Sequence, residues 1–209
     1  MSPQPAHSLE VERKYDVDEG AQLPDWTALS IVARVDAAEH RALDAQYRDT
    51  ADLALGRAGV AVRRRVGGPD AGWHIKASAA EGKHEWQWPL GEDVDEDVPA
   101  ELLKALTRWT TAPLVPLARI RNDRVAYALR DASGAVVAEV VDDHVEARDQ
   151  RTGAESSWRE WEVELGPAAP DDHAAFFAEV DALVIAAGGR VAASDSKLAR
   201  AISGSGSPG

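Results

Sequence analysis

Leu9-Glu10-Val11-Glu12-Arg13-Lys14-Tyr15 is the alternating stretch on which the fold of this chain depends. Because side chains of a β-strand alternate between two faces, Glu10, Glu12 and Lys14 share one face, and Val11, Arg13 and Tyr15 share the other. A solvated face would explain one such strand, since charged side chains are rarely buried without partners. Several such strands in one chain would need another explanation.

The same alternation returns in several later stretches, which are separated by turn residues such as Gly67-Gly68 and Gly82. Large apolar side chains occupy one face of these stretches, and charged side chains occupy the other. The charged faces carry Arg63 with Arg65, Lys76, Lys83 with Glu85, Arg119 with Arg121, Glu139 with Asp143, and Glu160 with Glu162 and Glu164. Arg124 shares the face of Arg119 and Arg121 only if a bulge lies near Asn122.

About eight strands joined by tight turns predict an antiparallel sheet closed into a barrel, since closure removes exposed edges. Helices are expected at 97–109, capped by Asp97, at 171–187 and near 196–200, with a short one between Thr50 and Gly59. The sequence therefore predicts an α+β protein, an eight-stranded antiparallel closed β-barrel with a charged lumen and helices packed outside. We expect one domain at 9–202, a flexible N-terminus at 1–8 and a disordered Gly/Ser/Pro tail at 203–209.

The composition excludes several classes of function. A formal net charge of −13 opposes binding of nucleic acid on an open surface, and the absence of cysteine excludes disulfides and thiolate metal sites. The six histidines show no ligand spacing and are expected to be structural or exposed. No stretch approaches the roughly 18 apolar residues that span a bilayer, so we expect a cytoplasmic protein without a membrane partner. We expect the protein to be a monomer or a homodimer.

Charges of both signs in one lumen predict a binding site, because a buried ion costs several kcal/mol unless it is paired. If the first and last strands are neighbours, Glu10, Glu12, Glu162 and Glu164 form a patch of oxygen ligands suited to Mg²⁺ or Mn²⁺. Arginines and lysines at two-residue spacing suit a polyanion. Metal and cations together are typical of phosphoryl transfer. The alternative is a solvent-facing sheet with cross-strand ion pairs.

The residues in this order resemble the CYTH domain family, also called triphosphate tunnel metalloenzymes. The resemblance extends from Leu9 to Ile202 and rests on Glu10-x-Glu12-x-Lys14, Tyr47-x-Asp49-Thr50, Arg63-x-Arg65, Lys76, Lys83-x-Glu85, Arg119 with Arg121, Glu139 with Asp143, Glu162-x-Glu164-Leu165 and Ser196-Lys197. It implies an eight-stranded tunnel in which first-strand and last-strand glutamates hold a divalent metal, and lumen lysines and arginines bind a triphosphate. The family commonly has arginine at the position of Lys83.

We therefore expect a Mg²⁺- or Mn²⁺-dependent triphosphatase that acts on inorganic triphosphate or a small organic triphosphate, with a metal-bound water as nucleophile. The expected catalytic residues are Lys14, Arg63, Arg65, Lys76, Glu85, Arg119 and Arg121. The same cations would bind substrate together with Lys83, Arg124 and Lys197. The expected metal ligands are Glu10, Glu12, Glu139, Asp143, Glu162 and Glu164, whereas Glu160 at a strand end is equally well explained by a rim salt bridge.

Two alternatives stay open at this point. A class IV adenylyl cyclase would hold ATP by the same triphosphate contacts and form cyclic AMP, but the sequence shows no constellation that reads a base. A non-catalytic module could bind polyphosphate or a nucleotide, but four carboxylates beside a polyanion would repel it unless a cation intervened.

Overall fold

The computed structural model describes residues 5–91, 97–194 and 196–203. The strands are β1 Ala6–Glu10, β2 Glu12–Val17, β3 Arg34–Val35, β4 Glu39–Thr50, β5 Val60–Val66, β6 Gly72–Ala79, β7 Gly82–Pro89, β8 Leu114–Arg130, β9 Val136–Asp149, β10 Glu155–Leu165 and β11 Arg190–Val191. The helices are α1 Ala54–Arg57, α2 Ala100–Leu106, α3 His173–Ala186 and α4 Lys197–Ser203, with a 3₁₀ turn η1 at Trp26–Ala28. No helix in these ranges is long and apolar enough to cross a bilayer.

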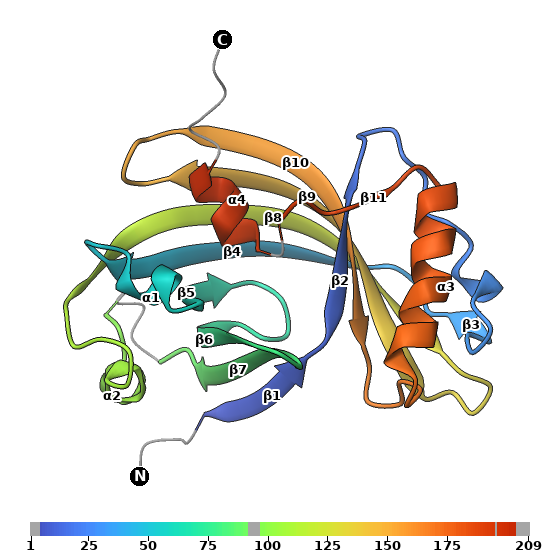
Figure 1. Ribbon diagram of the computed structural model, residues 1–209, viewed down its shortest axis with the longest axis horizontal. Coiled ribbons are helices and arrows are strands. Elements are labelled where there is room, and N and C mark those ends of the chain that lie inside the picture. The colour runs from blue at the N-terminus through green and yellow to red at the C-terminus, as the bar shows by residue number, and fades with distance from the viewer. Residues whose placement is uncertain (1–4, 92–96, 195, 204–209) are drawn as a thin grey trace.

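The strands form one curled antiparallel sheet, in the order β1-β7-β6-β5-β4-β8-β9-β10-β2-β11, with β3 beside β8 (Figure 1). Only Val11 separates β1 from β2, so the opening stretch pairs with β7 at one end of this order and with β10 near the other. The predicted antiparallel barrel architecture is confirmed, but the barrel is open and curled instead of closed. Within the described residues it has eleven strands instead of eight, because the opening stretch divides at Val11 and the short β3 and β11 are added.

The first strand begins earlier than expected. Ala6–Ser8 pairs with Glu85–Gln87 of β7, so the predicted flexible N-terminus is wrong over these residues. Residues 1–4 and 204–209, which include most of the predicted tail, lie outside the described residues.

The main hydrophobic core lies outside the barrel, between the sheet and α3. Trp161 and Val163 of β10 and Val140 of β9 pack with Phe177 and Val180 of α3, and all five are buried. Figure 1 shows α3 on the convex side of the sheet, beyond β2, β9 and β10. The apolar faces of the alternating strands therefore pack against the helix, and the side chains of the charged faces point into the barrel.

A second core lies outside β5, β6 and β7, where Trp73 and Trp88 pack with Leu102 and Leu106 of α2. The helix predicted at 97–109 is shorter, because it begins after Pro99 and ends at Leu106. Its N-cap is Pro99 with no side-chain hydrogen bond, so the predicted cap by Asp97 is wrong.

Helix α4 packs inside the curled sheet rather than outside it. Leu198 and Ala201 contact Ala45 of β4, Ile120 of β8 and Ala147 of β9 in one buried cluster. The view in Figure 1 places α4 in the concave part of the sheet, on the side opposite α3. The prediction that all helices lie outside the barrel is thus wrong for α4, which covers one end of the lumen.

Replacing Trp161 by alanine should lower the free energy of unfolding by about 3–5 kcal/mol, because its side chain is fully buried at the centre of the main core. Urea denaturation would measure this difference. The matched control is Ile185→Ala on α3, where the side chain is 56% exposed and the expected change is within about 0.5 kcal/mol. Equal effects of the two substitutions would contradict this assignment of the core.

Candidate active site

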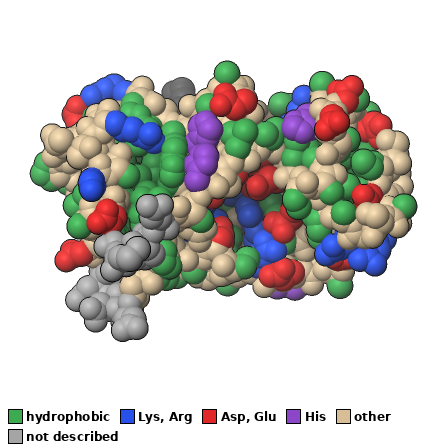
Figure 2. Space-filling view, turned by 90° about the horizontal axis from the view of Figure 1, so that it is seen from below, with side chains coloured by type: hydrophobic (Ala, Val, Ile, Leu, Met, Phe, Trp, Pro, Cys, Tyr) green, Lys and Arg blue, Asp and Glu red, His purple; other side chains and the backbone are tan. Residues whose placement is uncertain are grey.

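The concave side of the sheet encloses a cavity of about 760 Å³ whose wall carries many charged side chains. In the view of Figure 2, basic and acidic side chains gather in a hollow near the middle of the molecule. The cations of the wall are Lys14, Arg41, Arg57, Arg63, Arg65, Lys76, Lys83, Arg124 and Lys197. Its carboxylates are Glu10, Glu12, Asp49, Asp70, Glu85, Glu139, Glu162 and Glu164.

β2 pairs with β10, so the opening stretch of the sequence lies beside the last of the long strands. This is the arrangement that a shared carboxylate patch needs. On β2 and β10, Lys14 lies opposite Glu162 and Glu12 lies opposite Glu164. Directly opposite residues have their Cβ atoms about 4.5–5.5 Å apart. The two glutamates of the opening stretch and those of β10 therefore lie on one wall of the cavity.

The opposite part of the wall is basic. Arg63 and Arg65 of β5 and Arg124 of β8 all line the cavity. Arg124 contacts Asp143 through Nε at 2.8 Å and through Nη2 at 2.7 Å, while Arg65 pairs with Asp70. Burial, and then the charges of Arg63 and Arg124, lower the pKa of Arg65. Like charges therefore crowd this cluster, which we call the arginine cluster (Arg63, Arg65 and Arg124).

Glu85 connects the arginine cluster to the lysines of the next strands. Its Oε1 lies 3.3 Å from Arg63 Nη2 and 3.5 Å from Lys76 Nζ. Behind it, the fully buried His74 contacts Glu85 Oε1 through Nδ1 at 2.8 Å and the Asp70 carbonyl through Nε2 at 3.0 Å. His74 thus holds Glu85 in place, a structural role in agreement with the expectation for the histidines.

The lysines of the cavity pair with the carboxylates of the opening stretch. Lys14 Nζ and Lys83 Nζ each lie 2.8 Å from Glu12, on different oxygens, and Lys76 Nζ lies 2.5 Å from Glu10 Oε2. Burial works to raise the pKa of Glu12, but these lysines outweigh it and bring the pKa to about 2. Each of these lysines would be available to a phosphate only if a second cation took its place beside the glutamates.

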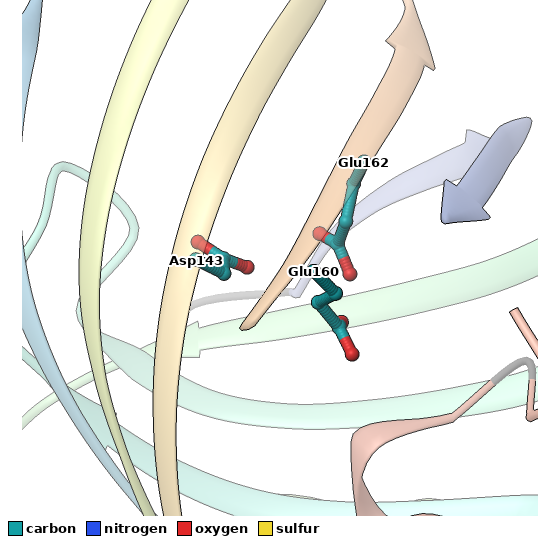
Figure 3. A group of neighbouring side chains, drawn as sticks. All are labelled: Asp143, Glu160 and Glu162. Carbon is teal, nitrogen blue, oxygen red and sulfur yellow. The ribbon is translucent and has the colours of Figure 1, made fainter. Parts of the chain in front are cut away.

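Asp143, Glu160 and Glu162 form a buried group whose carboxylate oxygens lie within 4.8 Å of one another. Figure 3 shows the three side chains, from β9 and β10, pointing into one space. Lys197 Nζ of α4 occupies this space, at 2.8 Å from Asp143, 2.5 Å from Glu160 and 2.6 Å from Glu162. Although burial opposes it, Lys14 and Lys197 hold the pKa of Glu162 well below its usual range. Lys197, together with Lys14 and Arg124, therefore already offsets the negative charge of this group.

Glu164 is in the opposite situation. Among the described residues, no lysine, arginine or histidine makes an ion pair with its carboxylate, and Glu12 is its cross-strand neighbour. Burial raises the pKa of Glu164 to about 7, and the charges of Glu10 and Glu12 add to the effect. We call Glu10, Glu12 and Glu164 the glutamate cluster. Its three carboxylates are matched by three lysines, but these lysines pair with Glu10 and Glu12 and leave Glu164 without an ion-pair partner among the described residues. The oxygen donors of the cluster suit a hard divalent cation.

Replacing Glu164 by glutamine should stabilise the metal-free protein at alkaline pH. The folded-state pKa of about 7 lies above the ordinary pKa of 4.5 for a glutamate, so the wild-type chain loses stability as the pH rises through 7. The gain from Glu164→Gln should be absent near pH 4 and reach the order of 3 kcal/mol at pH 8. Urea denaturation in EDTA across this range would measure it, with Glu155→Gln, a 71% exposed side chain on the same strand, as control. A difference in the free energy of unfolding that does not change with pH would contradict the raised pKa of Glu164.

The structure contradicts the predicted lumen position of Arg119 and Arg121. Their side chains are 41% and 60% exposed, and both pair with Asp44 on the outer face, Arg119 Nη2 at 2.5 Å and Arg121 Nε at 3.7 Å. Arg124 faces the cavity without a bulge near Asn122, because β4 and β8 pair regularly from Arg41–Arg124 to Tyr47–Ala118. Arg119 and Arg121 lie at odd positions of β8 and Arg124 at an even one, so alternation places them on opposite faces.

Two residues of the cavity region were not assigned to the site from the sequence. Arg41 lines the cavity and binds Glu139 with two bonds of 3.0 and 3.1 Å, so this predicted metal ligand is paired. Glu160, for which a rim salt bridge was as good an explanation as a metal contact, is 3% exposed and pairs with Lys197. Arg41 shares the parity of Tyr47 on β4, and this was the signal that could have identified it.

The other predicted residues line the cavity or lie beside it. Asp143 faces inward, whereas its neighbour Asp142 pairs with Arg159 at 2.8 Å. Lys76, Lys83 and Glu85 share the inward face of β6 and β7. The structure thus brings together all the predicted site residues except Arg119 and Arg121.

Known proteins share this fold. A proposed adenylate cyclase from Bacillus halodurans superposes with a TM-score of 0.61 at 15% identity, covering 93% of this chain and 97% of that one. HpAC1 from Hippeastrum, a proposed adenylyl cyclase described as having a dominant triphosphatase activity, gives 0.57 at 18% identity over 96% and 98%. PH1819 from Pyrococcus horikoshii gives 0.55 at 14% identity over 93% and 97%. At these identities the similarity establishes the fold alone.

Sequence comparison gives closer relatives. The chain is 39% identical over 223 aligned residues to the uncharacterized proteins MT2285 and Rv2226 of two Mycobacterium tuberculosis strains. The alignment covers all of this chain but 42% of each relative, so the chain spans about two fifths of their length. The family model of the CYTH domain matches residues 8–189. The chain therefore belongs to the CYTH domain family.

Proposed function

We propose that this protein is a Mg²⁺- or Mn²⁺-dependent triphosphatase that hydrolyses inorganic triphosphate or a small organic triphosphate. The CYTH family includes triphosphatases and adenylyl cyclases. The observation that carries the proposal is the presence of two like-charged clusters in the wall of one cavity, the arginine cluster and the glutamate cluster.

Burying like charges together is costly unless a ligand of opposite charge offsets them. Each guanidinium of the arginine cluster now pairs with a carboxylate. Together these groups could also hold phosphate oxygens, because guanidinium groups bind them through paired, charge-assisted hydrogen bonds. The glutamate cluster calls for a cation. A polyphosphate with a divalent metal satisfies both clusters, whereas a simple anion or a simple cation would satisfy only one.

The residues fit a hard divalent metal. Glu164 is a buried carboxylate without an ion-pair partner among the described residues, and Glu10 and Glu12 offer further oxygens from the neighbouring strands. Oxygen donors of this kind select Mg²⁺ or Mn²⁺, and the absence of cysteine leaves no softer thiolate ligands. When bound, such a metal neutralises phosphoryl oxygens as a Lewis acid.

The chain's own cations would orient the phosphate chain and offset the charge that develops on it. Arg63, Arg65 and Arg124 would bind phosphoryl oxygens from β5 and β8. Lys14, Lys76 and Lys83, now paired with Glu10 and Glu12, would transfer their hydrogen bonds to the substrate when the glutamates bind a metal. Glu85, held by His74, would keep Arg63 and Lys76 in position. The lysines and arginines of the cavity thereby stay paired before and after binding, and a bound metal would supply the partner that Glu164 lacks.

The test is to incubate the protein with tripolyphosphate or ATP, with Mn²⁺ or Mg²⁺, and to resolve the products. The proposal predicts release of orthophosphate, which EDTA abolishes. Cyclic AMP and pyrophosphate from ATP would instead identify a cyclase. Tight binding of tripolyphosphate with no product of either kind would identify a non-catalytic binding module.

A further inference from the structure

A pair of histidines lies on the outer face of the barrel, away from the cavity. His7 belongs to β1 and His84 to β7, and His7 Nε2 lies 3.2 Å from His84 Nδ1. Neither side chain lines the cavity. Figure 2 shows histidine side chains beside hydrophobic ones at the surface of the molecule. The two residues are 77 positions apart in the sequence, so their spacing along the chain could not reveal the pair.

Strand pairing brings the two histidines together. His7 lies opposite Trp86, and Leu9 lies opposite His84, so the histidines are diagonal neighbours on the same face of β1 and β7. Diagonal neighbours are about 7–8 Å apart, within reach of aromatic and other long side chains. Glu10 of β1 lines the cavity on the other face. The two strands therefore carry the metal-binding carboxylate proposed above on the inside and an imidazole pair on the outside.

The distance between the two ring nitrogens suits a shared metal ion. Zn²⁺ binds histidine nitrogens at about 2.0–2.1 Å, so two such ligands of a tetrahedral ion lie about 3.3 Å apart. The 3.2 Å between His7 Nε2 and His84 Nδ1 is close to that separation. The rings are inclined by 21° to each other. His7 is exposed and the His84 side chain is 32% exposed, so both rings have room to rotate toward one ion.

Neighbouring side chains hold the pair in this arrangement. Glu81 Oε1 lies 3.3 Å from His84 Nε2. A carboxylate at that position favours a proton on Nε2 and leaves Nδ1 able to bind a metal, which is how proteins commonly orient a histidine ligand. Trp86 flanks both rings, with its ring centroid 5.1 Å from that of His7 and 5.8 Å from that of His84. One nitrogen of each imidazole is thus directed toward the other imidazole.

The chemistry of the two ligands indicates the class of metal. Imidazole nitrogens suit Zn²⁺, Ni²⁺ and Cu²⁺, whereas Mg²⁺ and Mn²⁺ prefer oxygen. Water would complete the coordination of an ion held by two imidazoles at the surface. The histidine pair and the glutamate cluster therefore differ in the metals that they select.

We propose that His7 and His84 bind a divalent transition metal ion, and that this ion fastens β1 to β7. Among the described residues, β1 pairs with no strand other than β7, and four of its five residues are exposed. An ion that needs both histidines binds only while β1 is in place, so it stabilises the paired strand by mass action. The same strand supplies Glu10, but this inference does not depend on the proposed triphosphatase function.

The site is tested by calorimetric titration with Ni²⁺ in excess Mg²⁺, which occupies oxygen sites and binds imidazole poorly. His7→Ala and His84→Ala should each weaken Ni²⁺ binding at least about tenfold, since even residues that only support a ligand contribute that much. The matched control is His40→Ala on β4, an exposed histidine, which should leave the affinity unchanged. Circular dichroism would verify the fold of the three variants.

Amide hydrogen exchange over Ala6–Glu10, followed by mass spectrometry, tests the fastening of β1. At a Ni²⁺ concentration of about 100 times the dissociation constant, opening of the strand should be about 100-fold less frequent in the wild type. The His7→Ala variant should show no such slowing. Equal Ni²⁺ affinity in the wild type and both histidine variants would overturn the site. No slowing in the wild type, or equal slowing in His7→Ala, would overturn the fastening of β1.

Discussion

Replacing Arg63 by alanine should lower kcat/KM for triphosphate hydrolysis by about 100- to 1,000-fold, because it removes a buried, positioned guanidinium from the developing phosphoryl charge. Arg63 lines the cavity and is held between Tyr47 and Glu85 at 3.4 and 3.3 Å. The fold should persist, since the surrounding strands keep their apolar outer faces. Steady-state kinetics with tripolyphosphate and Mn²⁺ would measure the loss, and circular dichroism would verify the fold.

The matched control is Arg121→Ala. This arginine belongs to the same sequence pattern but is 60% exposed and pairs with Asp44 outside the cavity. Its loss should change kcat/KM by no more than about twofold, as is usual for exposed side chains. Comparison of the two variants therefore tests which strand faces line the cavity, as well as the role of the cavity in catalysis. A large loss in Arg121→Ala with a small loss in Arg63→Ala would contradict the structure of the cavity.

Replacing Glu164 by glutamine should weaken Mn²⁺ binding about 100-fold or more, since even residues that only support metal ligands contribute 10- to 100-fold to affinity. The amide keeps the shape of the side chain but loses the charge that attracts the cation. Calorimetric titration with Mn²⁺ in the absence of phosphate would measure this. At pH 8 the same variant should be more stable than the wild type without metal, because it removes the cost of burying a charged carboxylate and its repulsion with Glu10 and Glu12.

The control for the metal titration is Glu155→Gln, on the same strand and 71% exposed. It should leave Mn²⁺ affinity unchanged. Weakened binding in both variants would indicate a general effect of net charge, and unchanged binding in both would place the metal elsewhere, for example at Asp143, Glu160 and Glu162 if Lys197 moved away.

The architecture could be predicted from sequence because alternation identifies the two faces of each strand. On β10, Trp161 and Val163 lie on one face of the strand, and Glu162 and Glu164 lie on the other. Only one arrangement fits this alternation, with the apolar face outside the barrel and the charged face inside it. The number of strands could not be predicted, since a break at Val11 depends on pairing with two different strands, β7 and β10. The place of α4 could not be predicted either, because Leu198 and Ala201 fit an inner or an outer apolar surface equally well.

Strand β8 shows where reasoning from charge fails. It has arginines on both faces, because the outer face carries its own ion pairs with Asp44. Charge alone therefore does not reveal which arginines face inward. The register with β4 settles this: Arg124 lies opposite Arg41 and next to Asp143, while Arg121 lies opposite Asp44. The shift in this register falls between Tyr47 and Arg48, far from Asn122 where a bulge was expected.

The arginine and glutamate clusters are proposed to bind a polyphosphate and a divalent metal together. Calorimetric titration of a methylene-bridged, non-hydrolysable triphosphate, with Mn²⁺ and with EDTA, tests this claim most directly. Mn²⁺ should tighten binding of the triphosphate at least about tenfold. By thermodynamic linkage, the triphosphate should tighten binding of Mn²⁺ by the same factor. Triphosphate binding of equal affinity with Mn²⁺ and with EDTA would contradict it.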